Sequence, residues 1–201
     1  MRTLVNYFKL YPFSRFIFLL VCLFRTKLFY RPAKMIRFPF DIRGKRNIKF
    51  GTGFVTGFGC RLEAYTSEKS NAISIGDNVQ INDYVHITAM RNVTIGNNVL
   101  IASKVYISDC SHGSYAGDSL DSSPLSIPID RAYVIKDVII EDNVWLGEHV
   151  SVLPGVTIGS GTIVGSNSVV TKSLPPNIIA VGIPAKPIKK YNFETLIWDV
   201  I

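Results

Sequence analysis

Histidine and cysteine are scarce in this chain of 201 residues, which contains three of each. Cys22, Cys60 and Cys110 are odd in number and widely spaced, so they do not form a paired disulfide framework. No cleavable signal pattern accompanies them. We therefore expect a protein of the reducing cytoplasm, with Cys60 as a small core residue.

Long apolar runs are also lacking. The longest, from Phe13 to Phe24, is cut by Arg15 and is followed by Arg25. It is too short to span a bilayer, which needs about 20 residues. A basic, aromatic helical segment of this kind can lie in the interface of an anionic membrane. Alternatively, it packs as a cap on the end of the fold and keeps its basic side chains in water.

Acidic residues are nearly absent from the N-terminal part. Residues 1–47 hold eleven Lys and Arg residues against Asp41 alone, a net charge of +10, whereas the remainder carries −3. No recognition motif accompanies this charge, so we do not expect nucleic acid as a partner. We assign 1–47 to the basic helical segment and expect peripheral contact with the inner face of the cytoplasmic membrane.

A six-residue repeat occupies most of the rest of the chain. An aliphatic or similar residue recurs every sixth position, usually followed by glycine or a small polar residue. Six residues are too few to bury their own apolar side chain, so the units must wrap into coils and stack. The pattern predicts an all-β solenoid of about five coils, and its inward positions are Phe50, Thr56, Leu62, Ile75, Ile81, Ile87, Ile95, Ile101, Ile107, Ile140, Leu146, Val152, Ile158, Val164 and Val170.

The repeat is interrupted between residues 62 and 75, between 87 and 95, and, at greatest length, between 107 and 140. Insertions in a solenoid often lie on its binding face. The longest begins with Ser-Asp-Cys-Ser-His-Gly, which contains His112. We expect a solenoid domain over 48–185 with an inserted loop at 108–137, and a C-terminal tail, 186–201, that folds back onto the coil or a neighbour.

Five ordered segments carry a family resemblance: IGDNVQINDYVHI, IGNNVLIASKVYISDCSHG, NVWLGEHVSVLPGVTIG, NSVVTK and VGIPAKPIKKY. The chain resembles the hexapeptide-repeat acyltransferases, most of all the bacterial O-acetyltransferases of lipopolysaccharide O-antigen and related surface polysaccharides. The resemblance implies a left-handed parallel β-helix, a homotrimer, acetyl-CoA as donor and no metal. It also implies a sugar hydroxyl as acceptor, on a glycan that is lipid-linked or free.

His112 is the candidate catalytic base. Direct transfer of acetyl to a hydroxyl requires removal of the hydroxyl proton, and a neutral imidazole suits that task near pH 7. His112 follows Gly96 by sixteen residues, the spacing that the family resemblance implies for its catalytic histidine. Asp83, Asp109 and Glu148 are alternative candidates to orient the imidazole, and the sequence does not choose among them.

Asn82 is the second candidate catalytic residue, because galactoside-type members of the family place an asparagine there to hold the acceptor or the acetyl carbonyl. The alternative is a corner residue that adopts left-handed backbone, which Asn tolerates. The resemblance also implies donor contacts from an aromatic residue, small polar residues and cations near the phosphates of CoA: Trp145, Ser166, Thr171, Lys172, Lys186 and Lys189.

Other functions stay open at this stage. A small sugar, an amino sugar or an antibiotic could replace the polysaccharide as acceptor. The same solenoid serves γ-type carbonic anhydrases, which bind a metal through three histidines. However, His86, His112 and His149 do not share the register of that site. A non-catalytic scaffold would be expected to lack His112 or the Thr171-Lys172 pair, and neither is lacking.

Overall fold

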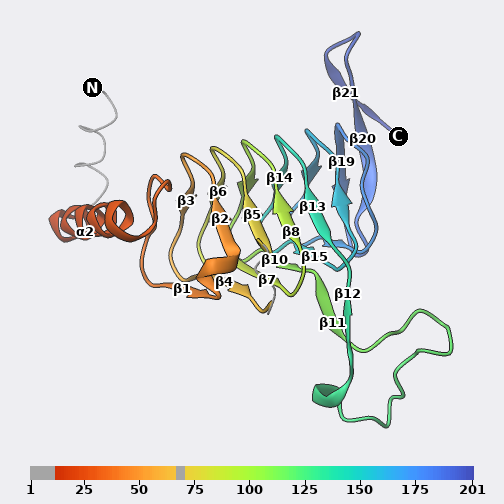
Figure 1. Cartoon of the computed structure of the whole chain (residues 1–201). Coiled ribbons are helices and arrows are strands. Elements are labelled where there is room, and N and C mark those ends of the chain that lie inside the picture. Colours follow the sequence, from red (N-terminus) through yellow and green to blue (C-terminus); the bar gives the residue numbers. More distant parts are fainter. Residues whose placement is uncertain (1–11, 67–70) are drawn as a thin grey trace.

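The computed structural model describes residues 12–66 and 71–201. Its main body is a coil of short parallel strands, with a helix at one end and a strand hairpin at the other (Figure 1). Arg2 and Lys9 of the basic segment, and residues 67–70 of the first interruption, lie outside the described residues.

The coil has three walls, each a sheet of parallel strands. Sheet C contains β2 (Ile48–Phe50), β5 (Ile73–Ile75), β8 (Val93–Ile95), β13 (Val138–Ile140) and β16 (Thr157–Ile158). Sheet A contains β3 (Val55–Thr56), β6 (Gln80–Ile81), β9 (Leu100–Ile101), β14 (Trp145–Leu146), β17 (Ile163–Val164) and β19 (Ile178–Val181). Sheet B contains β1 (Phe40–Arg43), β4 (Cys60–Ala64), β7 (His86–Ala89), β10 (Tyr106–Ser108), β15 (Ser151–Val152) and β18 (Val169–Val170). The chain passes from C to A to B five times, so the described part contains five complete coils, as expected.

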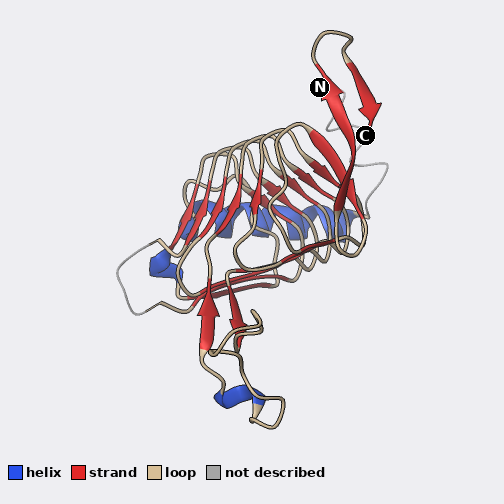
Figure 2. Cartoon of the chain, turned by 90° about the vertical axis from the view of Figure 1, so that its right-hand side faces the viewer, coloured by secondary structure: helices blue, strands red, loops and turns tan. Residues whose placement is uncertain are grey.

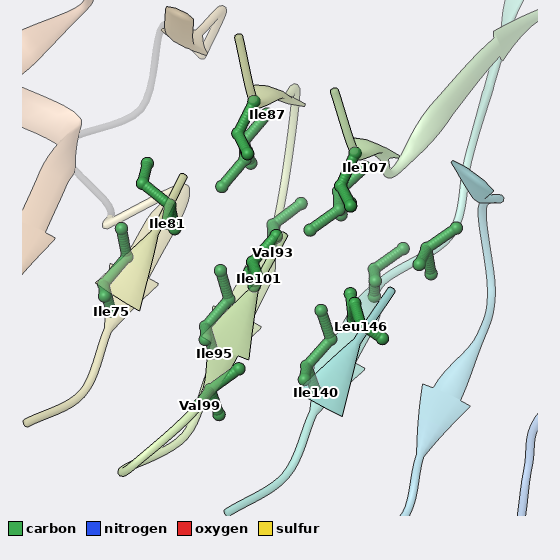
Figure 3. Close-up of a cluster of buried hydrophobic side chains, with 14 of the residues drawn as sticks. Ile75, Ile81, Ile87, Val93, Ile95, Val99, Ile101, Ile107, Ile140 and Leu146 are labelled. Carbon is green, nitrogen blue, oxygen red and sulfur yellow. The ribbon is translucent and has the colours of Figure 1, made fainter. Parts of the chain in front are cut away.

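The predicted inward positions form the core. All fifteen are buried, and residues one coil apart stack in register, as with Ile75, Ile95 and Ile140 (Figure 3). Fully burying one such aliphatic side chain contributes about 1.5–3 kcal/mol. Cys60 is also fully buried, as predicted. The repeat therefore specifies the fold through its stacked aliphatic columns.

The corners explain the small residues that follow the aliphatic positions. A Cβ on Gly96 would lie 2.3 Å from the Asp142 carboxylate of the next coil, so only glycine allows this close approach. Nearby, Asn98 and Asn143 adopt left-handed backbone with φ of 56° and 60°, a conformation that Asn tolerates better than most residues.

The parallel sheets begin earlier than predicted. β1 lies within the segment assigned to 1–47, yet it pairs with β4 and places Ile42 beside Leu62. A bridge between Met35 and Val55 also joins the preceding residues to sheet A. The expected boundary at residue 47 is therefore wrong. The pattern did not reveal these strands because Ile42 precedes Phe50 by eight residues rather than six, so the regular spacing is broken there.

Helix α2 (Phe13–Phe29) lies against this first partial coil. The Thr26 hydroxyl accepts a hydrogen bond from the Ile36 amide at 2.8 Å, and Cys22 is buried. Phe18 stacks on Phe58 with ring centroids 5.6 Å apart. No helix in the described ranges is long and apolar enough to cross a membrane.

The residues after the last coil form an antiparallel hairpin of β20 (Lys186–Asn192) and β21 (Ile197–Val200). β20 pairs with β19 and so extends sheet A, and the hairpin projects beyond the coil (Figure 2). The first part of the tail therefore pairs with the coil through β20, whereas β21 pairs only with β20. The remaining described elements are two short 3-10 helices, η1 (Lys45–Asn47) and η2 (Pro128–Asp130), and the strands β11 (Cys110–His112) and β12 (Tyr133–Ile135) of the insertion.

Candidate active site

The long insertion leaves the coil at Asp109, directly after β10. This carboxylate is fully buried and accepts three backbone N–H groups, from Met90 at 2.8 Å, Arg91 at 2.7 Å and Asn92 at 2.8 Å. Its own carbonyl accepts the Lys136 amide at 2.8 Å, where the insertion returns. Asp109 therefore ties both ends of the insertion to the turn between β7 and β8.

His112 lies at the end of β11 (Cys110–His112), which pairs antiparallel with β12 (Tyr133–Ile135). In this register His112 faces Tyr133, and their ring centroids are 4.4 Å apart. The Tyr115 hydroxyl donates to the His112 carbonyl at 2.8 Å and accepts from Arg131 at 2.7 Å. Both the strand pairing and the inserted loop therefore fix the backbone of His112.

None of the three expected carboxylates orients the imidazole within one chain. His112 Nδ1 is buried and has no hydrogen-bond partner among the described residues. Asp109 is engaged as above, Asp83 accepts the Phe58 amide at 2.7 Å, and Glu148 lies 4.0 Å from His149. Asp109, one of the three candidates, makes no hydrogen bond to His112 Nδ1 within one chain and instead accepts three backbone amides.

Two cavities meet at His112, on opposite sides along the coil axis. We call the first the late-coil cavity; it measures about 500 Å³ and extends past Lys136, Leu153 and Pro154 to Thr171. We call the second the tyrosine cavity; it measures about 430 Å³ and is lined by Tyr65, Thr88, Met90, Tyr106 and Tyr133. Both include Cys110, Ser111 and His112. The imidazole is thus placed where two ligands could meet.

Cys110 borders both cavities but does not have the character of a nucleophile. Burial raises the pKa of its thiol, so the thiol is protonated at neutral pH. Its sulfur lies 3.6 Å from the Ser108 hydroxyl. Cys60 is likewise a neutral core thiol, since burial raises its pKa to about 11.

Asn82 does not join His112 in one chain. It follows β6 at the corner between sheets A and B, and neither cavity beside His112 includes it. The left-handed residue of this corner is Tyr84, with φ of 57°, so backbone conformation does not explain the asparagine. Its side-chain oxygen accepts a hydrogen bond from Gln80 at 3.0 Å.

The predicted donor residues lie on separate faces of the chain. Thr171 lines the late-coil cavity, and Lys172 follows it at the exposed corner between sheets B and C. Trp145 is on the outer face of sheet A, with 47% of its surface exposed, and Ser166 is exposed at the end of β17. Lys186 and Lys189 are on β20. One chain therefore brings only Thr171 into the cavity that contains His112.

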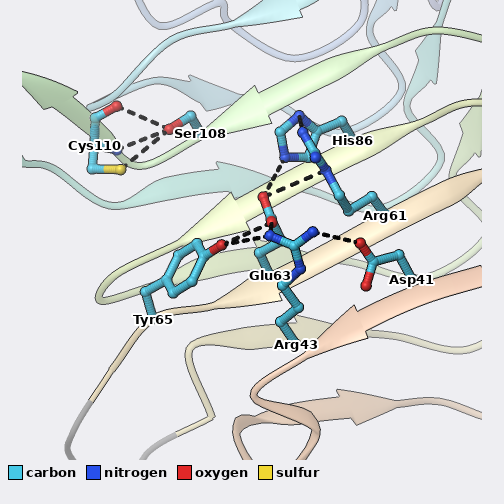
Figure 4. A network of polar contacts seen from close by, with 8 residues as sticks. All are labelled: Asp41, Arg43, Arg61, Glu63, Tyr65, His86, Ser108 and Cys110. Carbon is cyan, nitrogen blue, oxygen red and sulfur yellow. Dashed lines mark hydrogen bonds and ion pairs between the residues drawn. The ribbon is translucent and has the colours of Figure 1, made fainter.

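A polar network on sheet B was not anticipated from the sequence (Figure 4). Glu63 is 5% exposed and accepts hydrogen bonds from His86 Nε2 at 2.7 Å and the Tyr65 hydroxyl at 2.8 Å, and it pairs with Arg43 at 2.8 Å. Burial alone would raise the pKa of Glu63, but these hydrogen bonds and the charge of Arg61 outweigh it and lower the pKa below its usual value.

The three histidines have unrelated surroundings. His86 belongs to the Glu63 network, His112 to the insertion, and His149 to an exposed corner beside Glu148. Within residues 12–66 and 71–201, no group of three His, Cys, Asp or Glu side chains is arranged to hold a metal ion. The three histidines thus do not meet within one chain.

Comparison with known proteins assigns the family. Residues 137–172 match the family model described as "Bacterial transferase hexapeptide (six repeats)". The chain is 48% identical over 191 residues, 95% of its length and 96% of the relative's, to Escherichia coli (strain K12) WbbJ, whose name provisionally assigns it as a lipopolysaccharide biosynthesis O-acetyl transferase. The galactoside O-acetyltransferase of the same organism is 47% identical over 55 residues, 27% of each chain.

A solved structure supports the same fold. AntD, an N-acyltransferase from Bacillus cereus crystallised with dTDP and 3-hydroxybutyryl-CoA, superimposes with a TM-score of 0.67. The match covers 82% of this chain and 83% of AntD at 22% identity. At that identity the likeness establishes the fold, which is a left-handed β-helix, as expected.

Proposed function

This chain belongs to the hexapeptide-repeat acyltransferases, and we propose that it transfers an acetyl group from acetyl-CoA to a sugar hydroxyl of a bacterial surface polysaccharide. The observation that carries the proposal is the position of His112 at the junction of two cavities. The near full-length similarity to WbbJ supports the substrate class.

In the proposed reaction His112 acts as general base. Its imidazole takes the proton of the acceptor hydroxyl as the oxygen attacks the thioester carbonyl, and the resulting oxyanion collapses to release CoA as its thiolate. The imidazolium then returns the proton to the leaving sulfur. The product is an acetyl ester and free CoA, and no covalent enzyme intermediate forms. The protonated thiol of Cys110 agrees with this direct transfer.

Acetyl-CoA would occupy the late-coil cavity. Thr171 and Lys136 would supply polar contacts there, and Lys172, exposed and next to Thr171 in the chain, would contact a phosphate. Lysine offers a point charge rather than the bidentate contact of arginine. Trp145, Ser166, Lys186 and Lys189 are on other faces, so they would reach the same donor only from an adjacent subunit.

A homotrimer would provide that subunit, and a catalytic role for Asn82 would require a neighbour to bring it to His112, because one chain keeps them apart. The outer face of sheet A supports this association, because Leu100, Trp145, Ile163 and Ile179 form an apolar column along it. Exposed apolar surface of this kind favours burial against another copy. Sedimentation that reveals an active monomer would contradict the trimer.

We further propose that α2 brings the enzyme to anionic membrane, where a lipid-linked acceptor would be presented. One stripe of the helix is apolar and exposed: Phe13, Ile17, Leu20, Phe24 and Leu28. The nearby Arg25, Lys27 and Arg31 are exposed and can contact lipid headgroups. This contact would leave the opposite stripe packed on the coil.

Two measurements test the proposed function. Mass spectrometry of the surface polysaccharide should show a loss of acetyl groups in cells that lack the protein. His112→Ala should lower the turnover rate by about 10²–10⁴, the usual contribution of a general base, and should leave acetyl-CoA affinity nearly unchanged. Retention of more than about a tenth of the wild-type rate, a loss below about 1.4 kcal/mol, would exclude His112 as the base.

A further inference from the structure

The tyrosine cavity has no part in the donor site proposed above. We propose that it binds a neutral pyranose ring of the acceptor, and that Tyr65 and Tyr133 determine which sugar is accepted. This inference rests on the proposed transfer to a sugar, and it adds the location of the ring and the residues that select it.

The walls of the cavity match the surface of a pyranose. At about 430 Å³ the cavity falls within the range of small-molecule sites, about 300–1,000 Å³. Tyr65, Tyr106 and Tyr133 supply apolar ring surfaces that end in a hydroxyl, and Thr88 adds a hydroxyl that can donate or accept. A pyranose has an apolar C–H face and a rim of hydroxyls, so both kinds of surface would be used.

Tyr65 is exposed and yet held in place. The residue is 51% exposed, but its hydroxyl donates to the buried Glu63 at 2.8 Å and accepts from Arg43 at 3.2 Å. Burial of a carboxylate is costly unless several partners offset it. Glu63 has such partners, and they fix one wall of the cavity in advance of binding. A wall fixed in this way loses less conformational entropy when a ligand packs against it.

The charges next to the cavity favour a neutral ring. The guanidinium groups of Arg43 and Arg61 are balanced by the carboxylates of Asp41 and Glu63. His86 bridges this group by facing Arg61 through Nδ1 and Glu63 through Nε2. Because the positive and negative charges cancel, a charged sugar would gain no net electrostatic attraction here to offset the loss of its hydration. A neutral sugar does not need such an attraction.

Tyr133 places the ring next to the chemistry. It faces His112 across the β11–β12 pair, and the residue is 46% exposed. A sugar that packs against Tyr133 would therefore bring a hydroxyl to the imidazole. The donor, in the late-coil cavity, would approach the same imidazole from the opposite side.

Binding and kinetics can be separated experimentally. The probes are neutral methyl pyranosides of glucose, galactose, mannose and rhamnose, with methyl glucuronide and methyl glucosaminide as charged comparators. Their binding to the full-length protein is followed by saturation-transfer NMR, and acetyl-CoA binding by calorimetry. At least one neutral pyranoside should bind. Tyr65→Ala and Tyr133→Ala should each weaken it about tenfold, which corresponds to about 1.4 kcal/mol, and should change acetyl-CoA affinity less than about twofold.

Leu153→Ala, in the late-coil cavity, is the matched comparison and should weaken acetyl-CoA rather than the pyranoside. Tyr65→Ala also removes a partner of Glu63, so Tyr133→Ala, on another element, provides an independent variant. The inference is overturned if no neutral pyranoside binds, or if both tyrosine variants weaken only the donor. If a pyranoside binds but no acetyl group is transferred, the cavity is supported and the proposed function is overturned. If cells that lack the protein lose polysaccharide acetyl groups but the purified protein binds no pyranoside, the proposed function is supported and the cavity assignment is overturned.

Discussion

The buried carboxylate of Asp109 permits a quantitative prediction. Asp109→Asn keeps the size of the side chain but replaces one acceptor oxygen by an NH₂ donor. Oδ1 accepts from Met90, and Oδ2 accepts from both Arg91 and Asn92. In the orientation of the substituted side chain that keeps more hydrogen bonds, the amide oxygen still accepts from Arg91 and Asn92. Its NH₂ group then faces the Met90 N–H, and both groups are donors.

The variant thus loses one hydrogen bond to a charged acceptor, weakens two others and buries an unsatisfied N–H. Each such loss is worth about 1–3 kcal/mol, so we expect a total destabilisation of about 3 kcal/mol. For a chain of this size, that corresponds to a melting temperature lower by roughly 6–12 °C. The measurement is thermal unfolding by circular dichroism, with limited proteolysis of residues 113–132 as a second readout, because Asp109 holds both ends of the insertion.

Asp77→Asn is the matched control. Asp77 is exposed at a coil corner and accepts the Thr52 amide at 2.6 Å. One coil later the equivalent residue is Asn97, which accepts the Asp77 amide at 2.8 Å, so asparagine already performs this role in the chain. We expect a change within about 0.5 kcal/mol. If Asp109→Asn melts at the same temperature as Asp77→Asn, the buried carboxylate does not stabilise the insertion as argued.

Three further predictions concern the donor, pH and the membrane. Lys172→Ala should raise the KM for acetyl-CoA with a smaller effect on kcat, because a phosphate contact far from the reacting carbon stabilises the bound substrate and the transition state about equally. A fall in kcat with an unchanged KM would refute this. The folded-state pKa of Glu63 is below its unfolded value, so its stabilisation is complete above about pH 4.3 and lost as pH falls through the folded pKa. Glu63→Gln should accordingly flatten the acid limb of stability measured by thermal unfolding, and an unchanged limb would count against the network. Full-length protein should float with phosphatidylglycerol vesicles and be released by salt, whereas Phe24→Glu, at a position 68% exposed, should float less; equal recovery with phosphatidylcholine vesicles would exclude the contact.

The coils could be predicted from the sequence because a local rule determines them. Each inward residue packs on the residue at the same place in the next three-unit coil, so Ile75, Ile95 and Ile140 could be assigned to one column even though insertions change the number of residues between them. The rule failed at Ile42, which is eight residues rather than six before Phe50. There only the pairing of β1 with β4 reveals the strand.

The site was only partly predictable. His112 could be singled out by its place in a motif, but its neighbours depend on how the insertion returns. Tyr133 reaches His112 through antiparallel pairing across the inserted loop. Tyr65 directly follows β4, which is two strands from β10 in sheet B. No spacing rule links these residues. Asp109 is a carboxylate close to His112 in the sequence, as an orienting residue would be. Its carboxylate instead accepts backbone amides of the turn between β7 and β8, which sequence patterns do not reveal.

The regular strand spacing of sheet B fixes the distance between His112 and the end of the coil covered by α2. β10, which leads into His112, is the fourth strand counted from β1, so three strand spacings, about 14 Å, separate it from the end covered by α2. Adding or removing one coil between them would move the base by about 4.8 Å along the axis without altering the base or the helix. With α2 resting on a membrane, the number of coils would decide how far along a lipid-linked glycan the acetylated sugar lies.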